Sequence, residues 1–180
     1  RYQVSREDQD ALAVESHRRA ARAQAEGRFE SQILPVEVKT RKGVVEFKTD
    51  EHVRAEANIE EMAKLRPAFA KDGSVTAGNA SGINDGAAAV VLVSGATLKA
   101  KGLTPLAKVI GWGYAGVEPS IMGIGPVKAV PIALKRAGLK LSDIDVIEAN
   151  EAFASQSCAV ARELGFDPEK VNPNGSGISL

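Results

Sequence analysis

The sequence predicts an α/β fold, and two features of its 180 residues support this class. From residue 74 onward, segments with strand-like patterns alternate with helical segments, most of which end at a glycine. Residues 86–94 (GAAAVVLVS) are almost all small or β-branched, which is typical of a strand buried on both faces of a layered sheet. Such alternation indicates sheets that are covered by helices.

Composition is that of an ordinary soluble globular protein, with 44% apolar and 26% charged residues. The 23 basic and 23 acidic residues balance, so charge gives no argument for a nucleic-acid partner. The sequence contains no run of about 18 apolar residues, so no membrane span is expected. A single cysteine cannot form a disulfide within the chain, which is compatible with a cytoplasmic location.

A long helix is expected over residues 5–26. Ser5 and Asp8 have the spacing of a capping box at its start, and Gly27 supplies a stop. Its apolar face is patchy, and most of its residues are charged or polar.

The remaining elements are shorter and follow from β-branched alternation for strands and from caps and glycine stops for helices. In chain order we expect strands at 33–38 and 43–47, a short helix from Asn58, strands at 74–79 and 86–94, a helix at 96–101, a strand at 106–114, a helix at 125–137, a strand at 145–148, a helix at 152–164 and a last strand from Val171.

Residues 150–154 (NEAFA) lie between an expected strand and an expected helix. Backbone N–H groups at such a helix start can bind a ligand. An ordinary helix start explains the same residues, with Asn150 as the cap, Glu151 beside the helix dipole and Phe153 in the core. Similarly, the small residues of 76–82 (TAGNASG) suit a narrow substituent lying against the backbone, or a turn between two strands.

Three stretches together resemble the later half of a thiolase: TAGNASGINDGAA at 76–88, EANEAFA at 148–154 and VNPNGSGISL at 171–180. Thiolases make or cleave 3-ketoacyl-CoA. The resemblance implies part of a five-layered α-β-α-β-α sandwich plus most of its loop domain. Residues 1–82 would belong to the CoA-binding loop domain, 83–103 to the end of the N-terminal core domain and 104–180 to the first part of the C-terminal core domain.

The resemblance also implies roles for individual residues. Asn150 would hold a water that forms an oxyanion hole for the thioester oxygen, and such a donor contributes a few kcal/mol to transition-state stabilisation. The residues implied to contact CoA or the acyl group are Arg54, Phe69, Ala77, Ser81, Met122, Ala152 and Phe153. Coenzyme A thioesters are substrates here, and no cofactor is implied.

Two residue types that often carry chemistry are given structural interpretations. Cys158 lies inside an apolar helical segment and has no glycine-rich sequence around it, so we expect an inert buried thiol. His17 and His52 have no further histidine or cysteine at the spacing of metal ligands, so no metal site is expected.

The implied activity is that of an acetyl-CoA C-acetyltransferase, which condenses two acetyl-CoA to acetoacetyl-CoA and CoA or catalyses the reverse thiolysis. A longer-chain 3-ketoacyl-CoA thiolase of fatty-acid oxidation and a non-catalytic thiolase-like scaffold are the alternatives. The family's nucleophilic cysteine, catalytic histidine and second cysteine have no counterpart in these residues. The chain is therefore expected to be an internal, inactive portion of a cytoplasmic enzyme that is a homotetramer when complete.

Overall fold

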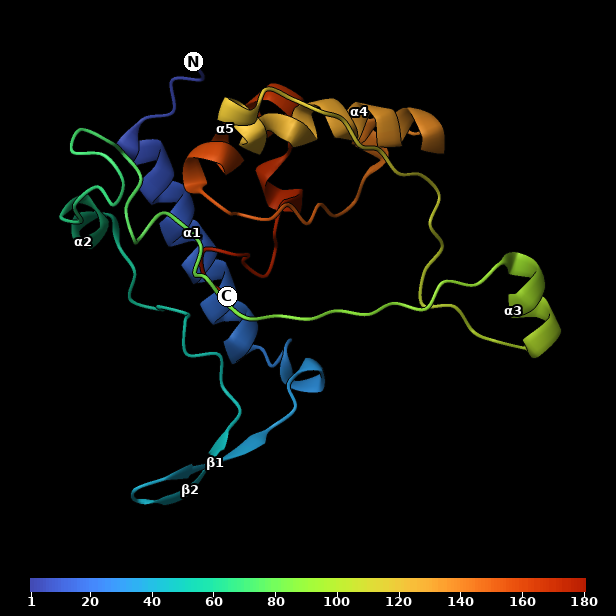
Figure 1. Ribbon diagram of the computed structural model, residues 1–180, viewed down its shortest axis with the longest axis horizontal. Helices are drawn as coiled ribbons and strands as arrows, with labels where there is room; N and C mark the ends of the chain where they lie inside the picture. The colour runs from blue at the N-terminus through green and yellow to red at the C-terminus, as the bar shows by residue number, and fades with distance from the viewer.

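The computed structural model describes all 180 residues (Figure 1). Its α-helices, 3₁₀-helices (η) and strands are, in chain order, α1 (Arg6–Ala25), η1 (Glu30–Gln32), β1 (Val36–Thr40), β2 (Gly43–Phe47), α2 (Ile59–Ala63), α3 (Gly95–Lys101), η2 (Pro119–Ile124), α4 (Gly125–Ala137), η3 (Leu141–Asp143), α5 (Ala154–Leu164) and η4 (Pro168–Lys170).

The long first helix forms as its local sequence predicts. The Ser5 hydroxyl accepts the N–H of Asp8 at 3.0 Å, and the Asp8 carboxylate accepts the N–H of Ser5 at 3.0 Å. This reciprocal capping box satisfies two backbone donors that a helix start leaves without partners. Gly27 follows the helix with φ of 69°, a left-handed conformation that glycine adopts without steric cost.

Helix α1 is the element around which the others pack. It contacts α2 and α5, and α5 in turn contacts α4 and η2 (Figure 1). One small core joins α1, α2, α5 and the C-terminal segment through Ala13, Met62, Ala154 and Ile178, and a second lies around Ile124, Ala159 and Val160. Only 20 of the 180 residues are buried, so these residues alone enclose little apolar volume.

A single sheet forms, the antiparallel hairpin of β1 and β2, which projects from the rest of the chain (Figure 1). Its register runs from the pair Val36 and Phe47 to the pair Thr40 and Gly43. The strand expected at 43–47 is confirmed, whereas the strand expected at 33–38 begins later, after Pro35.

The predictions of strands at 86–94 and 106–114 are wrong for these residues. A strand needs a neighbour with which to share ladder hydrogen bonds, and these segments run extended to and from α3 without one (Figure 1). Val91 is 91% exposed and Leu106 is fully exposed, so the apolar side chains of these two residues are left uncovered.

The strands expected at 74–79 and 145–148 do not form; a turn replaces the first and a single isolated bridge replaces the second. Residues 76–79 form a turn, because the Asn79 side-chain oxygen accepts the N–H of Thr76 at 2.8 Å. Ile147 forms one isolated parallel bridge with Val171, where the last strand was expected. The helices expected at 96–101 and 125–137 are confirmed, and the third begins at Ala154, two residues later than expected.

None of the helices combines the length and the apolar character that crossing a membrane would require.

Candidate functional site

Backbone hydrogen bonds join residues 79–81 to residues 152–154, so two of the sequence motifs lie side by side. The N–H of Ser81 donates to the carbonyl of Ala152 at 3.0 Å, and the N–H of Ala154 donates to the carbonyl of Asn79 at 2.9 Å. Ala80 and Phe153 form an antiparallel bridge between these bonds. The structure therefore brings together Ser81, Ala152 and Phe153.

Two further candidate side chains, Phe69 and Met122, lie near Phe153. Phe69 packs edge-on against it, with ring centroids 6.2 Å apart and an interplanar angle of 72°. Met122 and Phe153 line the same open cavity of about 500 Å³, whose other side is formed by residues 1–4. The Phe69 and Met122 side chains are largely exposed, which leaves their apolar surface available for a ligand.

The loop that precedes Arg54 lies close to residues 81 and 82. Its backbone N–H donates to Nδ1 of His17 at 3.2 Å, while its side chain is exposed. Gly82 lies against the neighbouring His52, because a Cβ added at Gly82 would fall 2.9 Å from the His52 ring carbon Cε1. The Arg54 loop and Ser81 are therefore close neighbours.

His17 must be neutral to accept this bond. Burial, together with the charges of His52 and Arg54, lowers the pKa of His17 to about 4. His17 is only 3% exposed, although most residues of its helix are charged or polar.

The small residues at 76–82 have two different roles. A Cβ at Gly78 would fall 2.5 Å from Leu65 Cδ1 and from Met62 Sδ, so packing within the chain already requires glycine there. Ala77, by contrast, is exposed and has no such neighbour. The exposed Ala77 is available to a ligand that needs a flat surface.

Asn150 does not cap a helix. Helix α5 begins at Ala154, and its N-terminal cap position is Phe153, whose side chain makes no capping bond. The Asn150 side chain is exposed, and its Oδ1 lies beside Gly177, where an added Cβ would be only 2.6 Å away. The ordinary helix-start interpretation is therefore wrong for Asn150, and its role in an oxyanion hole stays a prediction.

Glu151, the next residue, is buried instead of lying beside a helix dipole. It is 5% exposed and accepts hydrogen bonds from the Ser16 hydroxyl at 2.6 Å and from the Asn172 side-chain amide at 3.1 Å. Neither partner was predicted from the sequence. The signal was Ser16 within the row of small residues on α1 (Ala13, Ser16, Ala20 and Ala23), since such a row permits close approach of another segment.

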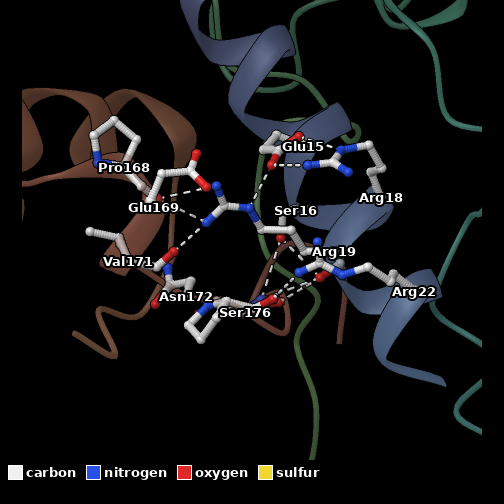
Figure 2. Close-up of polar contacts among 12 residues, drawn as sticks. Glu15, Ser16, Arg18, Arg19, Arg22, Pro168, Glu169, Val171, Asn172 and Ser176 are labelled. Carbon is white, nitrogen blue, oxygen red and sulfur yellow. Dashed lines mark hydrogen bonds and ion pairs between the residues drawn. The ribbon is translucent and has the colours of Figure 1, made fainter. Parts of the chain in front are cut away.

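Arginines of α1 hold residues 168–173, which include the Glu151 partner Asn172 (Figure 2). Arg19 donates to the backbone carbonyls of Pro168, at 3.1 Å, and Val171, and Arg22 donates to the carbonyl of Pro173 at 2.9 Å. The Glu15 carboxylate contacts Arg19 at 2.5 Å and fixes the orientation of that guanidinium group. The C-terminal residues are thus fastened along one face of α1.

Cys158 is placed as a structural residue. It is buried, burial raises the pKa of its thiol, and its nearest polar contact is the backbone carbonyl of Asp8 at 3.7 Å. A thiol in such surroundings is a poor nucleophile. No group of three or more His, Cys, Asp or Glu side chains is placed to hold a metal ion.

Two family models match almost the whole chain. The model described as the N-terminal domain of thiolase matches residues 1–96, and the model described as the C-terminal domain matches residues 103–180. Beta-ketothiolase BktB of Cupriavidus necator is 62% identical over 180 residues, which are 99% of this chain and 46% of that protein.

Solved structures agree with this match. The acetyl-CoA acetyltransferase of Bacillus anthracis superposes with a TM-score of 0.91 at 52% identity, over 99% of this chain and 45% of that chain. Human mitochondrial 3-ketoacyl-CoA thiolase in complex with CoA gives a TM-score of 0.89 at 47% identity, over 98% and 44%. The chain spans a little under half the length of these relatives. The predicted fold class, an α/β thiolase fold, is confirmed, and the chain belongs to the thiolase family.

Proposed function

We propose that residues 1–180 form the CoA-binding middle part of an acetyl-CoA C-acetyltransferase. The enzyme would condense two acetyl-CoA to acetoacetyl-CoA and CoA, or catalyse the reverse thiolysis. The observation that supports this most directly is the pairing of residues 79–81 with 152–154, because it unites two separate motifs on one surface. We divide the chain into a loop domain (1–82), the end of one core domain (83–103) and the start of the other (104–180).

The CoA thioester would lie along this surface. The exposed guanidinium of Arg54 suits stacking on the adenine ring, since it is planar and remains charged. The Ser81 hydroxyl makes no hydrogen bond within the chain, so it is available for the amides of the pantetheine arm, with Ala77 packing beside it. Ala152, Phe153, Phe69 and Met122 would surround the acyl end.

Asn150 would act on the thioester oxygen. Its side-chain amide makes no hydrogen bond within the chain and can hold a water that donates to the oxyanion. In the reaction a histidine would take the proton of a cysteine thiol, the thiolate would attack the thioester carbonyl, and CoA would leave as its thiol with that proton. A second cysteine would then remove an α-proton from a second acetyl-CoA, and the resulting enolate would displace the first cysteine from the acyl-enzyme. Because Cys158 is buried, the attacking thiolate would lie outside residues 1–180.

A longer-chain 3-ketoacyl-CoA thiolase is the second candidate. Phe69 and Met122 are 76% and 78% exposed, so within these residues nothing closes the acyl end of the surface and limits chain length. The apolar side chains exposed at 83–114 would be covered by the remainder of the two core domains, and those on the β1–β2 hairpin would be covered in a homotetramer in the cytoplasm, which we include in the proposal. A non-catalytic scaffold would use the same surface for binding without turnover.

A chimeric enzyme tests the proposal. Residues 1–180 would replace the matching 180 residues of Cupriavidus necator BktB, with which they are 62% identical. We expect CoA-dependent cleavage of acetoacetyl-CoA, followed by loss of its enolate absorbance, and a preference for C4 over longer 3-ketoacyl-CoA substrates. A folded tetrameric chimera without turnover would favour the scaffold, and a preference for longer substrates would favour the second candidate.

A further inference from the structure

Glu151 is a buried carboxylate held by α1 and by the C-terminal segment. The Ser16 hydroxyl of α1 donates to Oε2 at 2.6 Å, and the Asn172 amide donates to Oε1 at 3.1 Å. The hydroxyl of Ser179 lies 2.9 Å from that of Ser16 and extends the network to the C-terminal segment.

Such a carboxylate is costly as a purely structural element. Burial raises the pKa of Glu151, although its hydrogen-bond donors oppose the shift. Buried ionic groups add little net stability compared with apolar residues of the same volume, because removal from water offsets their attractions. A network of this kind instead specifies one geometry, provided that every acceptor has its donor.

The geometry that is specified is that of Asn150. On one side of it, Ala149 is held through both backbone groups: its N–H donates to Asn172 Oδ1 and its carbonyl accepts from Asn172 Nδ2, each at 2.8 Å. On the other side, Glu151 accepts from the same Asn172 amide. One asparagine side chain therefore fixes the residues before and after Asn150.

The same contacts set the surface that Asn150 faces. The N–H of Ser176 lies 3.4 Å from the Ser16 hydroxyl and 3.3 Å from that of Ser179, and the Ser176 hydroxyl donates to the carbonyl of Ala149 at 3.4 Å. Figure 2 shows Ser16 of α1 beside Asn172 and Ser176 of the C-terminal segment. Gly177, against which the Asn150 amide lies, is thus fastened by the network that holds Glu151.

We propose that Glu151 is a positioning residue that, through Asn172 and Ser16, holds the Asn150 amide at a fixed orientation against residues 176–178. This inference rests on the proposed function of Asn150 in thioester chemistry. Glu151 touches no substrate atom. Its effect is to keep the amide of Asn150 aimed at the thioester oxygen in every turnover.

The test compares Glu151→Gln and Glu151→Ala in the chimera with Glu148→Gln, which changes an exposed glutamate three residues earlier. Glu151→Gln keeps the volume but presents an N–H₂ group to the Asn172 or Ser16 donors. We expect kcat to fall about tenfold in Glu151→Gln, less than the roughly 10²–10³-fold cost of losing an oxyanion donor, and more in Glu151→Ala. The KM for acetoacetyl-CoA and the activity of Glu148→Gln should stay unchanged.

A double-mutant cycle separates positioning from general stability. In an Asn150→Ala background, Glu151→Gln should lower kcat little further, because there is no longer an amide to orient. Equal losses in both backgrounds, or an unchanged kcat in both Glu151 variants, would overturn the inference. An Asn150→Ala chimera with full turnover would refute the proposed function of Asn150 instead.

Hydrogen exchange gives a second measurement that does not depend on activity. Amide exchange in the peptides covering 149–153 and 176–180 should accelerate in Glu151→Gln and stay unchanged in Glu148→Gln. Unchanged exchange in these peptides would show that Glu151 does not hold the two segments together, whatever the chimera catalyses.

Discussion

The backbone N–H of Arg54 donates to Nδ1 of His17 at 3.2 Å, which ties the loop carrying a candidate CoA-binding residue to the buried face of α1. The bond exists only while His17 is neutral, since a protonated imidazole has no acceptor. Burial, with the charges of His52 and Arg54, keeps the pKa of His17 at about 4 instead of 6.5.

Acid should therefore weaken the fold through His17. Between pH 6.5 and about 4 the unfolded chain binds a proton that the folded chain does not, so stability falls as the pH drops through this window and is fully recovered above it. The shift corresponds to about 3 kcal/mol. We expect the urea midpoint of the chimera to decline over this range.

His17→Gln is the control for this titration, because its side-chain oxygen can still accept the N–H of Arg54 but cannot be protonated. Its urea midpoint should decline less between pH 6.5 and 4. The carboxyls of Asp8 and Glu15, whose pKa values are lowered to about 2 from 3.8 and 4.5, contribute from the lower end of that window downward and do so equally in both proteins. Parallel profiles for the two proteins would contradict the assignment to His17.

Asn150 and the CoA-binding residues should separate turnover from affinity. In the chimera, Asn150→Ala should lower kcat roughly 10²–10³-fold with little change in KM, the usual cost of one oxyanion-hole donor. Ser81→Ala and Arg54→Ala should do the opposite and raise the KM for CoA more than they lower kcat. An Asn150→Ala enzyme with normal kcat and a raised KM would place Asn150 among the binding residues.

The isolated 180-residue chain should not cleave acetoacetyl-CoA. Its one cysteine is buried, with a thiol pKa raised by burial, and no base lies within hydrogen-bond reach of its Sγ. Absorbance of the acetoacetyl-CoA enolate should stay constant when CoA is added. Turnover that Cys158→Ala abolishes would reverse the structural assignment of Cys158.

The isolated chain should also lack a sharp cooperative unfolding transition. Its 83–114 region exposes large apolar side chains, among them Val91, Leu106 and Trp112, which should promote association between chains. Few residues are buried elsewhere, so no large core supports a cooperative transition. Calorimetry and light scattering should show a broad transition and aggregation. A monomer with a narrow, reversible melt would contradict this prediction. It would mean that these segments are packed in solution, although they are exposed in the structure.

Local sequence determined the helices of this protein. The capping box of Ser5 and Asp8 and the left-handed glycines Gly138 and Gly165, which follow α4 and α5, involve hydrogen bonds between residues a few positions apart. Such signals can be read from the sequence without knowledge of the fold. The motifs that resembled a thiolase likewise indicated the family, which the comparisons confirm.

Tertiary structure alone decided the strands outside the β1–β2 hairpin and the buried polar contacts. The apolar run at 86–94 suits a strand, but a strand exists only where another segment supplies ladder hydrogen bonds. No other segment of the 180 residues pairs with 86–94. The sequence likewise placed Glu151 beside a helix dipole and indicated no partner for His17. Their true partners, Ser16 and Asn172 for Glu151 and Arg54 for His17, are distant in the chain, and a side chain's burial depends on which distant segments fold against it.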